Sequence, residues 1–270
     1  MADHDDVPLS REGKERSFRE NVLLAFSLAG VAGAVNAIGL AELGVLTSHV
    51  TGTATRLGVA LGSGGWLDAG RAFALLMAFV LGAMSATLLI EFAKRTHHPR
   101  FQLPLLVETV LLTALTLLAT LTDGPRTEGV FAVALALSVA MGLQNALVTR
   151  VSGAVVRTTH LTGLATDLGI ELVRVGAWFF DRTRGECLLD RLRHVAVVRR
   201  DPELYRARLH ATILCSFVLG CVVGSVAYAL VGALAMTLPV CVLLALVAYD
   251  RHLAVSDEDL DDDFNPDLSP

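Results

Sequence analysis

An eleven-residue motif that occurs twice holds the residue types best suited to chemistry. The copies span residues 48–58 and 159–169, and they share His, Thr, Gly, Ala, Thr, Leu and Gly at seven of eleven positions. Histidine titrates near neutral pH, and the first turn of a helix leaves backbone N–H groups without helical partners. We expect the motif to bind a solute or relay a proton, with these substrate-binding candidates: His49, Thr51, Gly52, Thr53, His160, Thr162 and Gly163.

Each copy of the motif predicts a short helix. Residues 51–61 favour a helix, and the Gly-rich residues 62–65 do not continue it cheaply. Such a helix covers about 16 Å, roughly half of the hydrocarbon thickness, which favours a re-entrant half-helix over a full span. Two inverted half-helices would direct their positive N-terminal ends at a solute near the midplane. Alternatively, the Thr and His side chains only cap the helix ends.

One motif position carries opposite charges in the two copies, Arg56 in the first and Asp167 in the second. A lone charge at the bilayer centre costs about 2.5–3.5 kcal/mol, so such residues usually pair or face water. We therefore predict an ion pair between the repeats, which braces the half-helices or gates a passage between them. The alternative is that each residue reaches its own interface or a separate partner.

Further polar residues interrupt the apolar segments. Asn36 and Asn145, the latter beside Gln144, are expected to hydrogen-bond across a helix bundle and to contribute to the site. Glu108 has Leu243 as its counterpart in the second half, so the fold does not need its charge. An intramembrane acid is a functional candidate by default, although Glu108 could instead reach the cytoplasmic interface.

The motif belongs to a larger duplication. Residues 33–37 match residues 142–146 at an offset of 109, residues 79–82 recur at 217–220, and residues 103–104 recur at 238–239. A period near 110 residues is too long for a solenoid repeat and indicates one unit duplicated and fused. We divide the chain into a polar N-terminus at 1–20, a first repeat at 21–128, a second repeat at 129–250 and an acidic tail at 251–270.

The chain is predicted to be an all-α membrane protein with six transmembrane helices, arranged as two inverted three-helix repeats. Hydrophobic residues make up 53% of it and gather into long uncharged or nearly uncharged runs of spanning length. The runs are residues 22–40, 72–90, 103–121, 129–149 and 211–249, of which the last is expected to turn back near Gly232. The Cys residues show no paired spacing and are expected to be small buried hydrophobes.

Charge placement predicts the topology. Basic residues precede the first span and reappear after the second, fourth and motif segments, which puts both termini in the cytoplasm and inverts the two halves. Residues 181–208 hold eight arginines and are expected to form an amphipathic helix on anionic lipid, or else a solvated linker. The acidic residues 251–270 are expected to be disordered.

The motif after a small-residue helix with an Asn resembles the YoaK-type family of uncharacterised bacterial membrane proteins, over roughly residues 20 to 250. The resemblance implies a polytopic protein of the bacterial inner membrane and brings no established activity. We expect a transporter or channel for an unknown small solute; the alternative is a non-transporting scaffold or sensor. No nucleophile motif, metal cluster or phosphate loop is found, so no enzyme, cofactor or metal is expected. Dispersed basic residues argue against nucleic-acid binding, and the sequence does not indicate an oligomeric state.

Overall fold

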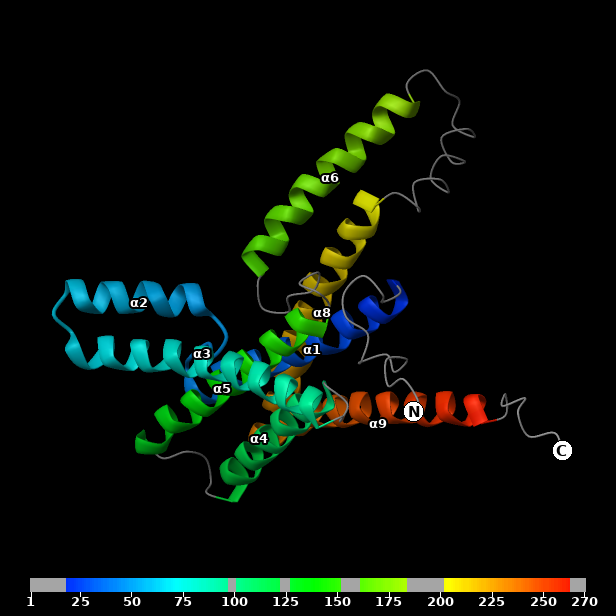
Figure 1. The fold of residues 1–270 in the computed structure, drawn as a ribbon. Coiled ribbons are helices and arrows are strands. Elements are labelled where there is room, and N and C mark those ends of the chain that lie inside the picture. The colour runs from blue at the N-terminus through cyan, green and yellow to red at the C-terminus, as the bar shows by residue number, and fades with distance from the viewer. Residues whose placement is uncertain (1–17, 97–100, 122–126, 152–160, 184–201, 263–270) are drawn as a thin grey trace.

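The computed structural model describes residues 18–96, 101–121, 127–151, 161–183 and 202–262, and each element in these ranges is helical (Figure 1). The elements in chain order are α1 (Phe18–Leu43), α2 (Val50–Gly62), α3 (Trp66–Arg95), α4 (Gln102–Leu121), α5 (Thr127–Val151), α6 (Leu161–Thr183), α8 (Pro202–Val231), the 3-10 helix η3 (Gly232–Met236) and α9 (Thr237–Asp262).

Five segments of the described residues are long and apolar enough to cross a membrane. They are Val22–Leu43, Trp66–Arg95, Gln102–Leu121, Gly129–Arg150 and Arg206–Tyr249. The last contains α8, η3 and α9, and the chain changes direction within it at Gly232, which has a φ of 60°. The predicted apolar runs and the predicted turn are therefore confirmed.

Two close helix crossings organise the bundle, α1 on α8 and α3 on α5. A β-carbon at Gly33 of α1 would overlap the carbonyl oxygen of Phe217 in α8. One at Gly142 of α5 would overlap the carbonyl oxygen of Phe79 in α3. The backbones touch at both crossings, and small residues are what allow helices in lipid to approach so closely.

The two crossings use equivalent residues of the duplication. Gly33 corresponds to Gly142 at the offset of 109, and Phe79 corresponds to Phe217 at the offset of 138. The first helix of each half therefore crosses the second helix of the other half through the same positions. This reciprocal packing interlocks the halves, so neither half has a complete core by itself.

α1 and α5 run in opposite directions. Gln144 of α5 donates from Nε2 to the carbonyl oxygen of Leu28, and Met141 of α5 accepts at Sδ from Asn36 Nδ2, so residue numbers fall along α5 as they rise along α1. Along α8, in contrast, Ser216 donates to the carbonyl of Phe26, and Tyr228, twelve positions further on, donates to Glu42 near the end of α1. Thus α1 is antiparallel to α5 and parallel to α8.

The core lies where α1, α4, α5, α8 and α9 meet. In the most apolar 18-residue stretch of α1, 67% of the residues are buried within the protein, whereas 22% are buried in the most apolar stretch of α3. α1 is therefore central, while α3 presents most of its apolar side chains outward, as a lipid-facing helix does. The largest fully buried side chains come mainly from the central helices, together with Ile90 of α3 and the residue before α4: Phe101, Leu28, Ile38, Ile90, Leu105, Leu112, Met141, Leu143, Leu147, Leu209, Ile213 and Leu243.

The motif helices lie outside this core and differ in length. α2 has 13 residues, which fits the predicted half-helix. α6 has 23 residues, so the prediction of a short half-helix is wrong for the second copy. The expected length of both helices came from the Gly-rich residues 62–65, which end the first helix. The second copy has no such Gly-rich segment, so its helix continues. Figure 1 shows α2 beside α3 and α6 beside α8, on different sides of the bundle.

The chain after the last span departs from the prediction in part. α9 continues to Asp262, so residues 251–262 of the predicted disordered tail are helical. The predicted amphipathic helix within 181–208 falls mainly on residues outside the described ranges.

Candidate functional site

His49 and Gly52 are coupled sterically at the start of α2. His49 occupies the N-cap position without making a side-chain capping hydrogen bond. Its Nδ1 lies where a β-carbon of residue 52 would be, so the imidazole can rest there only because residue 52 is Gly. The same spacing recurs in the second copy, where Gly163 lies on α6 and His160 is outside the described residues.

The motif threonines bond to their own helix backbone. Thr53 Oγ1 donates to the carbonyl of His49 at 3.0 Å, and Thr166 Oγ1 donates to the carbonyl of Thr162 at 3.0 Å. Both bonds point back one turn instead of forward onto the free N–H groups of the helix start. Thr51 and Thr162 are exposed at the N-termini of α2 and α6. These two bonds do not involve the hydroxyls of Thr51 and Thr162, for which capping of the helix ends stays the alternative prediction.

Asn36 ties the first motif to the central bundle. Its Oδ1 accepts from the hydroxyl of Ser48 at 2.9 Å and from the Ser48 backbone N–H at 3.3 Å, while its Nδ2 donates to the carbonyl of Ala32 at 2.8 Å. The predicted hydrogen bonding of Asn36 and Gln144 across the bundle is thus observed. Asn145, half-buried on α5, holds the equivalent position in the second half.

The second motif helix is held by a Glu–His contact that was not predicted from the sequence. Glu171 of α6 and His210 of α8 lie 3.0 Å apart, Oε2 to Nδ1, with little exposure of either side chain. The equivalent positions in the first half are Ala60 and Ala72, both buried. Comparing the two copies would have revealed this pair, since both residues replace alanine only in the second half.

The predicted ion pair between Arg56 and Asp167 is not formed within the described chain. Both side chains are exposed, and neither takes part in the salt bridges of the described residues. The physical reason is packing. Each motif helix lies along the second helix of its own half, α2 on α3 and α6 on α8, instead of meeting its counterpart across the bundle.

Glu108 is fully buried in α4, and neither carboxylate oxygen has a hydrogen-bond partner among the described residues. Protein therefore encloses the carboxyl group in the described part of the chain. Its equivalent in α9, Leu243, is also fully buried. Burying an ionised carboxylate without a partner is costly, so this position favours a neutral carboxyl group or a bound cation.

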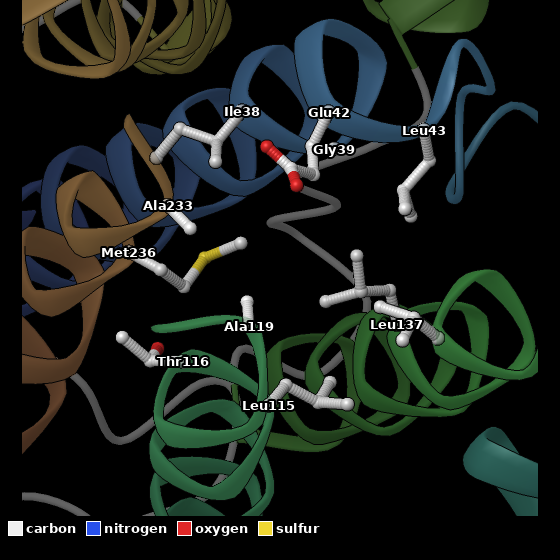
Figure 2. Close-up of a pocket in the computed structure, with 11 residues that line it drawn as sticks. Ile38, Gly39, Glu42, Leu43, Leu115, Thr116, Ala119, Leu137, Ala233 and Met236 are labelled. Atoms are coloured by element: carbon white, nitrogen blue, oxygen red, sulfur yellow. The ribbon is translucent and has the colours of Figure 1, made fainter. Parts of the chain in front are cut away.

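A pocket that the sequence analysis did not predict opens between α1, α4, α5 and η3 (Figure 2). Its cavity volume is about 30 Å³, and it is lined by Ile38, Gly39, Glu42, Leu43, Leu115, Thr116, Ala119, Val133, Leu137, Ala233 and Met236. Figure 2 shows the Glu42 carboxylate extending from α1 into this space. The phenol of Tyr228 in α8 donates to Glu42 Oε2 at 2.5 Å.

Five lining residues have counterparts in the other half whose side chains the structure describes. The repeat offsets relate Ile38, Gly39, Val133, Leu137 and Met236 to Leu147, Val148, Leu24, Leu28 and Phe101. All five counterparts are buried, with 4% exposure or less, and belong to one hydrophobic cluster. Ile38, Leu137 and Met236 belong to the same cluster and are also buried, with 6% exposure or less. Because α1 and α5 are antiparallel, the counterparts lie at the opposite end from the pocket.

No metal site is formed by His, Cys, Asp or Glu in the described part of the chain. Comparison with family models gives one match, to "Protein of unknown function (DUF1275)", over residues 24–249. The match covers both halves of the duplication and agrees with the resemblance drawn from the motif. Neither the curated proteins nor the solved structures contain a match.

Proposed function

The chain belongs to this family of unknown function, and from its own structure we propose that it is a transporter for a small solute. The solute enters the pocket between α1, α4, α5 and η3 and leaves through the equivalent, now closed, end. Transporters built from inverted repeats bind their solute at the repeat interface and expose it alternately to the two sides. The pocket lies at such an interface, because α1 and α4 come from the first half and α5 and η3 from the second.

The observation that carries this proposal is the position of the pocket, which lies between helices of both halves and holds the Glu42 carboxylate. In a duplicated bundle, equivalent residues can adopt either of two packings, and exchanging these packings between the halves would open the end opposite the pocket. In this proposal that opposite end is the closed end.

The arrangement across the membrane follows from charge. Lys94 and Arg95 end α3, and Arg150 near the end of α5 binds Glu91 at 2.9 Å, so basic residues gather at the closed end. The positive-inside rule assigns that end to the cytoplasm and the pocket to the outer side of the bacterial inner membrane. The observed helix directions support six spans as two inverted three-helix repeats, with both termini in the cytoplasm and α2 and α6 outside the count.

The motif residues are proposed to act at the edge of this pathway. Asn36 links Ser48 to Met141, so a shift of α1 against α5 would move the start of α2. His49 is exposed at that start. We therefore retain the motif as a candidate for solute handling, coupled to the bundle through Asn36.

Cysteine labelling from the two sides tests the proposal. In a chain without its native cysteines, Ala233→Cys reports the open end and Val148→Cys reports the closed end. Ala233→Cys should react with a membrane-impermeant maleimide from outside. Val148→Cys should react from inside, in the minority of molecules that have exchanged ends. A bulky maleimide on Ala233→Cys should then suppress labelling at Val148→Cys, because both ends do not open together.

The alternative of a scaffold or sensor predicts another result. In that case Val148→Cys stays unreactive from both sides under all conditions, and modification at residue 233 has no effect on it. This outcome would exclude alternating access. The control for labelling outside the pathway is Gly70→Cys. Residue 70 has no neighbouring atom within 4 Å of its β position.

A further inference from the structure

We propose that the pocket binds a small organic cation, an ammonium group on an apolar body, with the Glu42 carboxylate as its counter-ion. This inference deepens the proposed function, since it assigns a ligand class to the same pocket. It rests on the charge, the hydrogen bonding and the lining of the pocket.

The charge of the pocket comes from Glu42. No other lining residue is ionisable, and nine of the eleven lining residues are apolar or Gly. In the part of the chain that the structure describes, no base pairs with Glu42, which is half-buried and whose partner is a neutral phenol. A carboxylate that is partly desolvated and lacks a counter-ion attracts a cation strongly, because the apolar walls screen the charge poorly.

Tyr228 positions the carboxylate. Its hydroxyl donates to Oε2, which restricts the Glu42 side chain and leaves Oε1 for a ligand. The equivalent of Tyr228 in the first half is Ile90, and that of Glu42 in the second half is Val151. The pair therefore occurs at the open end alone, so the symmetric packing of the helices does not require it.

The lining selects against metal ions. Ca²⁺ and Mg²⁺ take six or more oxygen ligands, whereas the side chains here offer oxygen from Glu42 and Thr116 only. Ile38, Leu115 and Met236 instead offer apolar surface, and the flexible thioether of Met adapts to varied shapes. A cavity of about 30 Å³ has room for roughly two water molecules, so the cation has few carbon atoms.

Methylammonium is the probe, because it joins one positive charge to a single methyl group and suits the small cavity. Its binding to the purified full chain in detergent is measured with radiolabel, alongside its neutral isostere methanol. The wild-type chain should bind the cation saturably and the neutral isostere at least about tenfold more weakly, as expected for loss of a charge-assisted contact.

Three variants locate the site. Glu42→Gln should lose at least about tenfold in affinity for the cation. Tyr228→Phe should weaken the binding of the cation less, since this change removes the hydrogen bond to the Glu42 carboxylate but keeps the carboxylate itself. Asp68→Asn, which changes an exposed acid at the start of α3, is the matched control and should bind as the wild type does. Elution volume and thermal unfolding of each variant establish that it is folded.

Equal binding of the cation by the wild type and by folded Glu42→Gln would overturn the inference. Equal binding of the cation and its neutral isostere would overturn it too, because it would show adsorption that does not depend on charge. No saturable binding of the cation also overturns it, even where the labelling at residues 233 and 148 supports alternating access. Conversely, Glu42-dependent binding without reciprocal labelling leaves the cation site standing and removes the transport function. The two failures are thus distinguishable.

Discussion

Alanine at Gly33 or at Gly142 is expected to destabilise the protein by similar amounts. At each position the added methyl group meets a backbone carbonyl, of Phe217 or of Phe79, instead of a side chain that can rotate away. The helices must therefore separate along the whole crossing. Overpacking of this kind costs about 1–3 kcal/mol, and the higher helix propensity of alanine returns up to about 1 kcal/mol. We expect a net loss of about 1–2 kcal/mol for each substitution.

Two glycines of α3 provide the matched control. A methyl group at Gly82 would overlap the carbonyl oxygen of Val139, whereas one at Gly70 would have no neighbour within 4 Å. Gly82→Ala should destabilise, while Gly70→Ala should be neutral or stabilising by up to about 1 kcal/mol. Unfolding of the purified variants by SDS titration, followed by helical circular dichroism, measures these differences. Wild-type stability of Gly33→Ala and Gly142→Ala, or a loss in one of them alone, would refute the reciprocal crossings.

Three other outcomes follow from the side-chain contacts. Asn36→Ala should loosen the segment before α2, which hydrogen exchange detects as faster exchange there and unchanged exchange in α6. Glu171→Ala and His210→Ala should each destabilise the contact of α6 with α8, and the double variant should cost less than the sum by about 0.5–3 kcal/mol in a double-mutant cycle; strict additivity would show that they do not interact. Replacing His49 and His160 by Asn should flatten the pH dependence of solute handling around neutral pH, and an unchanged profile would assign them a structural role.

The sequence predicted the features that depend on local composition. Uncharged runs gave the spans, Gly232 marked the turn inside the last one, and the glycine-ended first motif gave the length of α2. The duplication also indicated which residues are equivalent. With that equivalence, the glycine pairs at the two crossings are explained by one rule, that small residues recur where helices touch.

The sequence did not predict which helices pack together. The expected meeting of Arg56 and Asp167 assumed that the motif helices face each other, but each packs within its own half, and nothing in the motif specifies its partner. The pocket was missed for a related reason. Glu42 lies at the end of an apolar run, where an acid usually reaches the interface. The contact of Glu42 with Tyr228, 186 residues later in the chain, shows that its side chain lies among the helices of the bundle.

The most direct test of the account is the side of the membrane on which equivalent motif positions lie. Gly62 of α2 and Val173 of α6 are equivalent at the offset of 111, and both are exposed. In a chain without its native cysteines, each is replaced by Cys and treated with a membrane-impermeant maleimide in intact and in permeabilised cells. Inverted repeats predict that Gly62→Cys reacts in intact cells and that Val173→Cys reacts only after permeabilisation. Labelling of both from the same side would contradict the inverted arrangement on which the transport proposal depends.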